Sequence, residues 1–133
     1  MKRLQKMLGA LALVSSAYLG SSRLEAATFN VPSQYQTIQS AVNASRDGDE
    51  IVVAPGRYLE NIVIDGKGIK IRSTIPANQD IVKSTIIDGQ TSNTVIILSN
   101  IAHSTATLEG LTITNGKAQY GGGINAKNSL FSL

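Results

Sequence analysis

A strand-and-turn pattern returns at intervals along this chain. Three segments each close an apolar or β-branched run with Asp-Gly or Asn-Gly: IVIDG at 62–66, TIIDG at 85–89 and LTITNG at 111–116. The isoleucines before these turns, Ile64, Ile87 and Ile113, are 23 and 26 residues apart. A period in the twenties made of strands and turns is typical of a β-solenoid, because a single coil cannot bury its own apolar face and stacks on its neighbour instead.

A second set of similar segments follows these turns: IKIRS at 69–73, VIILS at 95–99 and GGGIN at 121–125. The apolar runs 51–53 and 62–64 are continuous, as expected for strands buried in a packed sheet. We therefore predict that equivalent segments stack on one another, with Asp65 and Asp88 forming a ladder at one corner of the coil. The same dipeptides also close two-residue hairpins, so an antiparallel sandwich remains an alternative.

One stretch, QYQTIQSAVNASRDGD, has helical periodicity. Its residues Ile38, Ala41 and Val42 fall at i, i+3 and i+4, which places them on one face of a short helix. The Asp-Gly-Asp at 47–49 ends this helix, and 28–31 alternates as a first strand would. No helical periodicity follows. The sequence thus predicts an all-β fold, a parallel β-helix or solenoid with a short N-terminal capping helix.

The N-terminus has the layout of an export signal. Three basic residues in the first six positions precede an apolar run at 7–19 and a small-residue stretch ending in Ala26-Ala27. We predict that residues 1–27 are a secretory signal peptide and that 28–133 is the mature domain, secreted or displayed on a bacterial cell surface. A transmembrane anchor is the alternative, but the apolar run is shorter than the roughly 20 residues that a bilayer needs and is broken by two serines.

Charge and cysteine content exclude several functions. The chain has 12 Lys and Arg, 9 Asp and Glu, and no cysteine. Four of the basic residues and Glu25 lie in the predicted signal, so the mature chain has eight of each sign and is formally neutral. A neutral domain gives no reason to expect a nucleic-acid or anionic-membrane partner. Without cysteine there is no disulfide framework and no thiolate metal site, and we expect no cofactor and no metal.

A set of motifs in the first half of the chain resembles the opening of right-handed parallel β-helix proteins of the pectin-lyase-like superfamily. The residues that carry the resemblance are Thr37–Val42, Asp47-Gly48-Asp49, Ile51–Val53, Pro55-Gly56, Tyr58 and Glu60. The resemblance extends over about 28–127. It implies that the opening helix caps the first coil and that Gly-x-Tyr-x-Glu begins the stacked strands, with Tyr58 and Glu60 as structural positions.

Two branches of that superfamily are similar to different parts of the chain. The opening is most similar to pectinesterases, whereas YGGGINAKNS at 120–129 is similar to the Gly-Gly-x-Ile repeats of bacterial surface β-helix proteins, including polymorphic outer-membrane and adhesin-like families. Pectinesterases carry their chemistry in a later Gln-Asp pair followed by Thr and in a second Asp-containing strand. Here Gln79-Asp80 lies in a polar loop and lacks the Thr.

We therefore expect a non-catalytic chain with no catalytic residues. The alternative is a fragment of a pectin-active enzyme, a pectinesterase or polysaccharide lyase. Sugar-ester hydrolysis through carboxylates would need two acids facing one cleft, one of them with a raised pKa. The candidates are Glu60, Asp65, Asp88 and Glu109. Asp65 and Asp88 sit in turn dipeptides, which favours a structural role; stacked corner carboxylates as part of a calcium site are a further alternative.

Four residues are candidate contacts for a polysaccharide or cell-surface glycan. Lys70 and Arg72 alternate with isoleucines, which places their charges on the outer face of a strand, where they provide solubility or contact an acidic polysaccharide such as pectate. Tyr58 and Tyr120 carry rings that can stack on sugars, although packing roles are commoner. The single histidine, His103, lies in a polar stretch without acidic neighbours and is expected to be a solvated loop residue.

The last residues, NSLFSL, predict an incomplete solenoid. Leu130, Phe131 and Leu133 are apolar and no polar capping segment follows them. A solenoid that ends on a bare coil exposes unpaired backbone groups beside apolar side chains, which favours pairing with another chain. The sequence therefore predicts that 28–133 is the N-terminal portion of a truncated β-helix domain and that the chain self-associates end to end.

Overall fold

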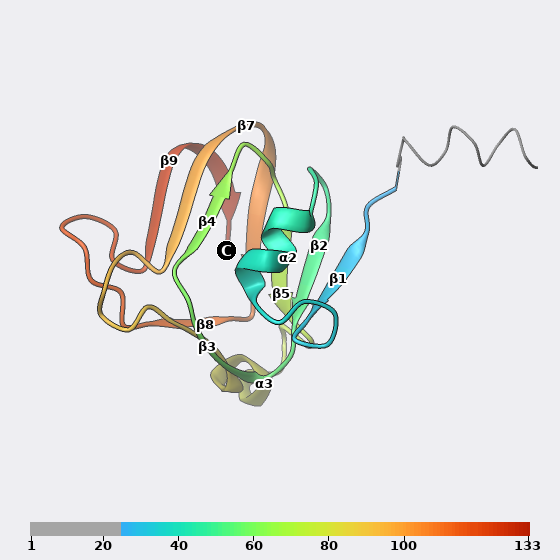
Figure 1. Cartoon of the computed structure of the whole chain (residues 1–133), viewed down its shortest axis with the longest axis vertical. Coiled ribbons are helices and arrows are strands. Elements are labelled where there is room, and N and C mark those ends of the chain that lie inside the picture. Colours follow the sequence, from blue (N-terminus) through green and yellow to red (C-terminus); the bar gives the residue numbers. More distant parts are fainter. Residues whose placement is uncertain (1–24) are drawn as a thin grey trace, which may run out of the picture.

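The computed structural model describes residues 25–133, and strands make up 46% of them (Figure 1). The predicted all-β class is confirmed. No helix in this described part of the chain has the length and apolar character needed to cross a membrane. The predicted signal peptide lies almost entirely outside the described residues.

Within residues 25–133, nine strands and two short helices follow one another. Their bounds are β1 (Thr28–Val31), α2 (Ile38–Ala44), β2 (Glu50–Val53), β3 (Gly56–Leu59), β4 (Ile62–Asp65), β5 (Lys70–Ser73), α3 (Gln79–Ser84), β6 (Thr85–Asp88), β7 (Ile96–Glu109), β8 (Thr112–Thr114) and β9 (Ile124–Ser132).

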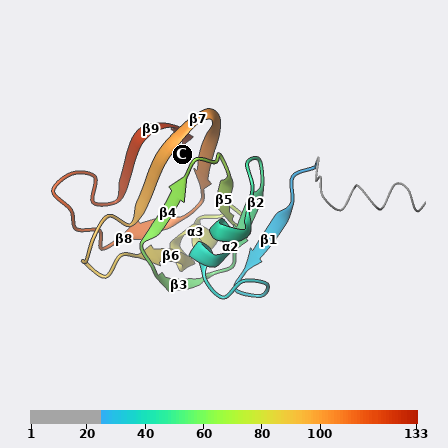
Figure 2. The same ribbon diagram turned by 45° about the horizontal axis from the view of Figure 1, so that its top comes forward.

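All strand pairings within residues 25–133 are parallel. One sheet has the order β1-β2-β5-β7-β4, with β9 also paired to β7, and the other has the order β3-β6-β8 (Figures 1 and 2). Partners are far apart in sequence, because parallel strands cannot be joined by a hairpin. Glu50 pairs with Lys70, for example, and Lys70 with Thr107. The predicted parallel pairing is confirmed and the antiparallel alternative is wrong for these strands.

Strand β7 belongs to two parts of the larger sheet. Its first residues, 96–99, pair with β4, and its last residues, 107–109, pair with β5. Figure 1 shows the strand bending sharply between these two parts. The strands therefore fall into three rows. The first row contains β1, β2, β5 and the ends of β7 and β9; the second contains β3, β6 and β8; the third contains β4 and the starts of β7 and β9.

Some of the predicted strand equivalences are correct and others are wrong. Ile87 pairs with Ile113, and the start of β7 pairs with Ile124 and its neighbours, as predicted. Ile64, however, pairs with Leu98 and not with Ile87. Likewise β5 pairs with β2 and with the end of β7, and not with 95–99. The segments between paired strands differ in length, so the spacing of similar motifs does not show which strands are neighbours.

The two helices illustrate what periodicity can and cannot find. Helix α2 forms where predicted, with Thr37 and Ser40 as a capping box and with Ile38, Ala41 and Val42 buried. Helix α3 was not predicted. Asn78 caps it by accepting hydrogen bonds from the N–H groups of Asp80 and Ile81, and none of its residues is buried. A six-residue helix without a buried stripe has no apolar periodicity to detect.

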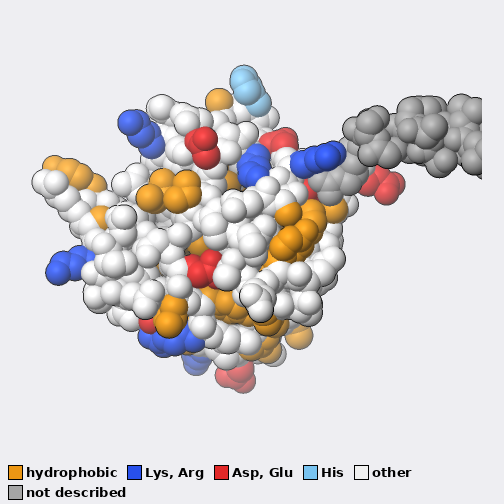
Figure 3. Space-filling view, viewed as in Figure 1, with side chains coloured by type: hydrophobic (Ala, Val, Ile, Leu, Met, Phe, Trp, Pro, Cys, Tyr) orange, Lys and Arg blue, Asp and Glu red, His pale blue; other side chains and the backbone are white. Residues whose placement is uncertain are grey.

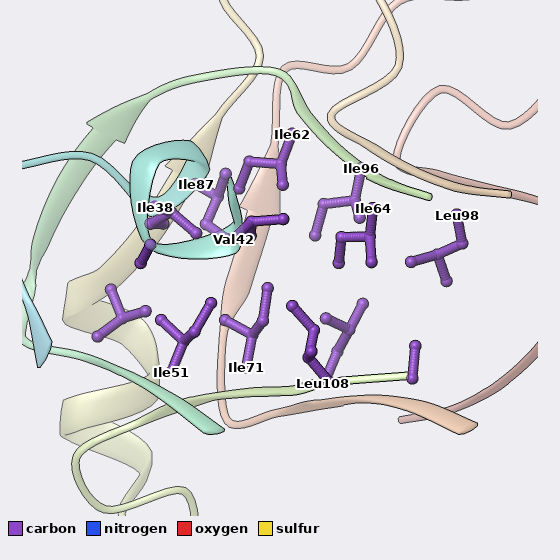
Figure 4. Packing of buried hydrophobic residues seen from close by; sticks show 14 of the residues in the cluster. Ile38, Val42, Ile51, Ile62, Ile64, Ile71, Ile87, Ile96, Leu98 and Leu108 are labelled. Atoms are coloured by element: carbon purple, nitrogen blue, oxygen red, sulfur yellow. The ribbon is translucent and has the colours of Figure 1, made fainter. Parts of the chain in front are cut away.

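The core lies between the rows and is made mostly of isoleucine stacked on isoleucine or leucine. Ile51, Ile71 and Leu108 are register partners along the first row, and all three are buried (Figure 4). Ile64 and Leu98 are buried partners in the third row. Similar side chains on successive parallel strands pack against one another, which gives the dense packing typical of protein interiors.

Candidate functional site

The outward side of the first row carries two acidic and two basic side chains on neighbouring strands. In β5 partly exposed and buried positions alternate, so that Lys70 and Arg72 face outward while Ile71 and Ser73 face the interior. The same alternation occurs in β2, where Glu50 and Val52 are less buried than Ile51 and Val53. We call the outward side chains of β2, β5 and the end of β7 the charged sheet face: Glu50, Val52, Lys70, Arg72, Thr107 and Glu109.

The two basic residues of the charged sheet face are each paired with a carboxylate on a neighbouring strand. Arg72 Nη2 lies 3.0 Å from Glu50 Oε2, and Lys70 Nζ lies 3.2 Å from Glu109 Oε2. By register Glu50 stands opposite Lys70 and Glu109 opposite Arg72, so both ion pairs run diagonally. With two charges of each sign, the face is neutral. Basic and acidic side chains are also interspersed on the side of the molecule seen in Figure 3.

The other two predicted contact residues lie elsewhere. Tyr58 is half-buried against the core in the second row, and its hydroxyl donates a 2.7 Å hydrogen bond to the carbonyl of Ala54. Burial raises the pKa of Tyr58, and the negative charge of Glu60 adds to this effect. Tyr120 is 75% exposed in the segment between β8 and β9, which projects on the opposite side from β1 and β2 in Figures 1 and 2. Among the four residues, the structure brings only Lys70 and Arg72 together.

Glu60 lies at the N-terminus of α2, not in a cleft with a second acid. Its two carboxylate oxygens accept hydrogen bonds of 2.9 Å from the backbone N–H groups of Ile38 and Gln39. These are donors that a helix leaves unpaired at its first turn, and a carboxylate there also interacts favourably with the helix dipole. Tyr58 and Glu60 thus make the internal contacts expected of structural positions.

The predicted ladder of Asp65 and Asp88 is wrong, because the two carboxylates lie at different corners. Asp65 accepts hydrogen bonds from Ser99 and Asn100, at 2.6 and 2.8 Å. At this corner the chain turns through three residues with left-handed backbone: Gly66, Asn100 and Asn128. Each of them directly follows a residue that is paired in register with the others on the neighbouring strand. Left-handed backbone favours Gly and Asn, so these positions form the corner column instead.

Asp88 is held at the corner that follows the second row. Its carboxylate accepts hydrogen bonds from the N–H of Gln90 and the amide of Asn115, and Arg57 contacts its other oxygen. These contacts lower the pKa of Asp88, chiefly through the Gln90 N–H and Asn115. A carboxyl group that acts as a general acid near neutral pH needs a raised pKa. The four candidate acids therefore lie at separate places, since Glu109 is engaged with Lys70.

We next asked whether the carboxylates of the described part of the chain could hold a metal ion. Within residues 25–133, no three His, Asp or Glu side chains come together as metal ligands. His103 is exposed within strand β7, so the expectation that it lies in a loop is wrong.

Two residues that hold α2 in place were missed by sequence reasoning. The side-chain amide of Gln39 pairs with both backbone groups of Val63: its oxygen accepts from the N–H at 2.7 Å and its nitrogen donates to the carbonyl at 3.1 Å. Lys67 Nζ donates to the carbonyls of Val42 and Ser45 at the other end of the helix. In sequence, each is an ordinary polar residue. Only their position beside the next coil reveals the role.

The corner carboxylates predict a loss of stability in acid. Hydrogen bonds from Ser99 and Asn100 lower the pKa of Asp65, and those from Ser104 and Gly68 lower the pKa of Asp47. A lowered folded-state pKa stabilises the fold above the unfolded value of about 3.9, and this contribution is lost as the pH falls through the folded value. We expect the urea midpoint to be nearly constant from about pH 7 to pH 5 and to fall below about pH 4. In Asp65→Asn the acid decline should be smaller; a midpoint that rises on acidification would contradict this assignment.

Comparison with protein-family models, curated proteins and solved structures returned no match for this chain. The fold and the site define its class by themselves: an all-β chain built from parallel sheets, with a charged but neutral sheet face. The resemblance to the pectin-lyase-like superfamily stays a prediction that rests on the motif residues.

Proposed function

We propose that residues 28–133 form a right-handed parallel β-helix that is secreted or displayed on a cell surface and acts as a non-catalytic, glycan-contacting module. The observation that carries this proposal is the arrangement of the strands in three parallel rows, with similar apolar side chains stacked along each row. Such rows are what successive coils of a β-helix produce.

The positions of the carboxylates support a scaffold over an enzyme. Glu60 caps a helix, Asp65 and Asp88 accept hydrogen bonds at two corners, and Glu109 pairs with Lys70. Each of these acids has a structural partner. A carboxylate whose pKa is lowered by hydrogen bonds is a poor proton donor near neutral pH.

The charged sheet face is the surface that best fits a glycan. Its strands lie about 4.8 Å apart, and it presents guanidinium, ammonium and carboxylate groups on a regular lattice. Sugar hydroxyls can both donate and accept hydrogen bonds, so they match groups of both signs. An acidic chain such as pectate would meet Glu50 and Glu109 as well as the two cations. The neutral charge of the face therefore favours a neutral polysaccharide.

Affinity electrophoresis through gels containing either a neutral plant glucan or polygalacturonate tests this proposal. We expect the neutral glucan to retard the protein more, and Arg72→Ala to weaken retardation about tenfold, since one charge-assisted hydrogen bond is worth about 1.5 kcal/mol. Lys83→Ala on α3, an exposed position away from the charged sheet face, is the matched control and should be retarded like the unmodified chain.

Two results would contradict the proposal. If the protein migrated equally in the two gels and in a gel without polysaccharide, the charged sheet face would not contact either glycan. Turnover of methylated pectin or polygalacturonate by the pure protein, with or without calcium, would show that the chain is an enzyme.

A further inference from the structure

The buried carboxylate of Asp49 holds the residue that precedes β1. Asp49 is only 2% exposed, and its Oδ2 accepts a 2.7 Å hydrogen bond from the N–H of Arg46. Its Oδ1 accepts a 2.8 Å hydrogen bond from the backbone nitrogen of Ala27, which lies 22 residues earlier in the chain. The carbonyl of Ala27 accepts a further hydrogen bond, of 2.9 Å, from the N–H of Glu50. Both backbone groups of Ala27 are therefore fixed to the segment that leads into β2.

The folded domain begins at the bond between Ala26 and Ala27. Glu25 and Ala26 are exposed, whereas Ala27 is partly buried. Strand β1 is at the edge of its sheet, and Figure 1 shows residues 25–27 reaching it from the outside of the molecule. A peptide bond at such a boundary is accessible to a protease, while the residue on its far side is already part of the fold.

We propose that an export signal peptidase hydrolyses the bond between Ala26 and Ala27, and that the new α-ammonium group of Ala27 forms an ion pair with Asp49. Water supplies the hydroxyl that adds to the carbonyl carbon of Ala26, the C–N bond breaks, and the nitrogen of Ala27 takes up protons. This inference rests on the proposed function, since only an exported chain meets such a peptidase. It makes Ala27 the first residue of the mature chain, one residue before the boundary that the sequence pattern predicts.

The sequence around this bond fits a signal peptidase better than the sequence around the next bond. These enzymes take a small side chain immediately before the cut and a small or aliphatic one two residues earlier. Cleavage after Ala26 places Ala26 and Leu24 at these two positions. Cleavage after Ala27 would instead place the charged side chain of Glu25 at the second position.

The contacts of Asp49 also favour Ala27 over Thr28 as the first residue. Loss of Ala27 would remove one donor from the carboxylate of Asp49 and the acceptor of the Glu50 N–H, and a buried polar group that loses its partner is costly. If Ala27 is retained, a full positive charge is placed on the atom that lies 2.8 Å from Asp49 Oδ1. A hydrogen bond between two charged groups is about twice as strong as a neutral one.

N-terminal sequencing of the protein that a bacterial host exports from the full chain tests the cleavage. We expect the first residues to be Ala-Thr-Phe-Asn. Ala26→Lys should abolish this N-terminus, because a long charged side chain does not fit the position before the cut. Ser22→Lys, in the same small-residue stretch, is the matched control and should leave the start at Ala27.

The reactivity of the new α-amine tests the ion pair. The processed protein is labelled with an amine-reactive ester near neutral pH, and its N-terminal peptide is quantified by mass spectrometry. We expect labelling to be about tenfold slower in the folded protein than in urea, since a nearby opposite charge shifts a protonation equilibrium by a power of ten or more. Asp49→Asn should remove most of this protection, whereas Asp80→Asn, at an exposed position on α3, should keep it. If Asp49→Asn does not fold, the ratio measured with and without urea for the unmodified protein decides by itself.

The possible failures of this inference and of the proposed function are distinguishable. An exported chain that begins at another residue would overturn the cleavage site and leave the proposed function in place. An α-amine of Ala27 that reacts equally fast in the folded and unfolded protein would overturn the ion pair alone. A chain that stays uncleaved inside the cell would contradict both the inference and the export that the proposed function includes.

Discussion

Replacing Ile71 by alanine is expected to lower the free energy of unfolding by about 2–5 kcal/mol, the usual cost of removing a large buried aliphatic side chain. Ile71 is fully buried in β5, and its register partners on either side are Ile51 and Leu108. The substitution leaves a cavity in the middle of the first row, where the neighbouring strands are held by ladder hydrogen bonds and cannot collapse into it. Urea denaturation followed by circular dichroism measures the loss.

Val63→Ala is the matched control for this prediction. Val63 is also an aliphatic residue in a central position of a four-residue strand, but its side chain is 44% exposed. Removing methyl groups that are largely in water should change the free energy of unfolding by less than about 1 kcal/mol. Equal losses in the two variants would show that the row of Ile51, Ile71 and Leu108 is not the centre of the core.

Glu60→Ala is expected to destabilise the protein by about 2 kcal/mol, at the upper end of the range for lost helix caps. The substitution removes both acceptors of the N–H groups of Ile38 and Gln39 and takes away the negative charge at the start of α2. Because Gln39 holds the edge of β4, loosening this helix should also expose the backbone of Val63. Amide hydrogen exchange at Val63 should therefore accelerate in Glu60→Ala.

Glu109→Gln separates this effect from a general loss of negative charge. Glu109 forms an ion pair with Lys70 on the partly exposed charged sheet face, where such a pair is worth at most about 1 kcal/mol. We expect a small change in stability and unchanged exchange at Val63. If the two variants lost stability equally and exchange at Val63 stayed slow in Glu60→Ala, the cap would have no role in holding the helix to the second coil.

Local patterns in the sequence were sufficient for several parts of the structure. The positions i, i+3 and i+4 of Ile38, Ala41 and Val42 correctly predict α2 and its buried face. Alternation in β5 correctly places Lys70 and Arg72 outward. Both signals arise within one element, where the period of 3.6 or 2 residues sets which side chains share a face. Turn dipeptides likewise mark corners, because left-handed backbone is favourable for few residue types.

What the sequence by itself determined is therefore the all-β class, the outward position of Lys70 and Arg72 on β5, and the helix α2. Only the tertiary structure decided which strands are neighbours: Ile64 lies beside Leu98, and Asp65 beside Ser99 and Asn100 rather than Asp88. The physical reason is that neighbouring strands in a row are joined by chain segments of unequal length. Contacts such as those of Gln39 with Val63 thus depend on how the strands are paired, which no local period encodes.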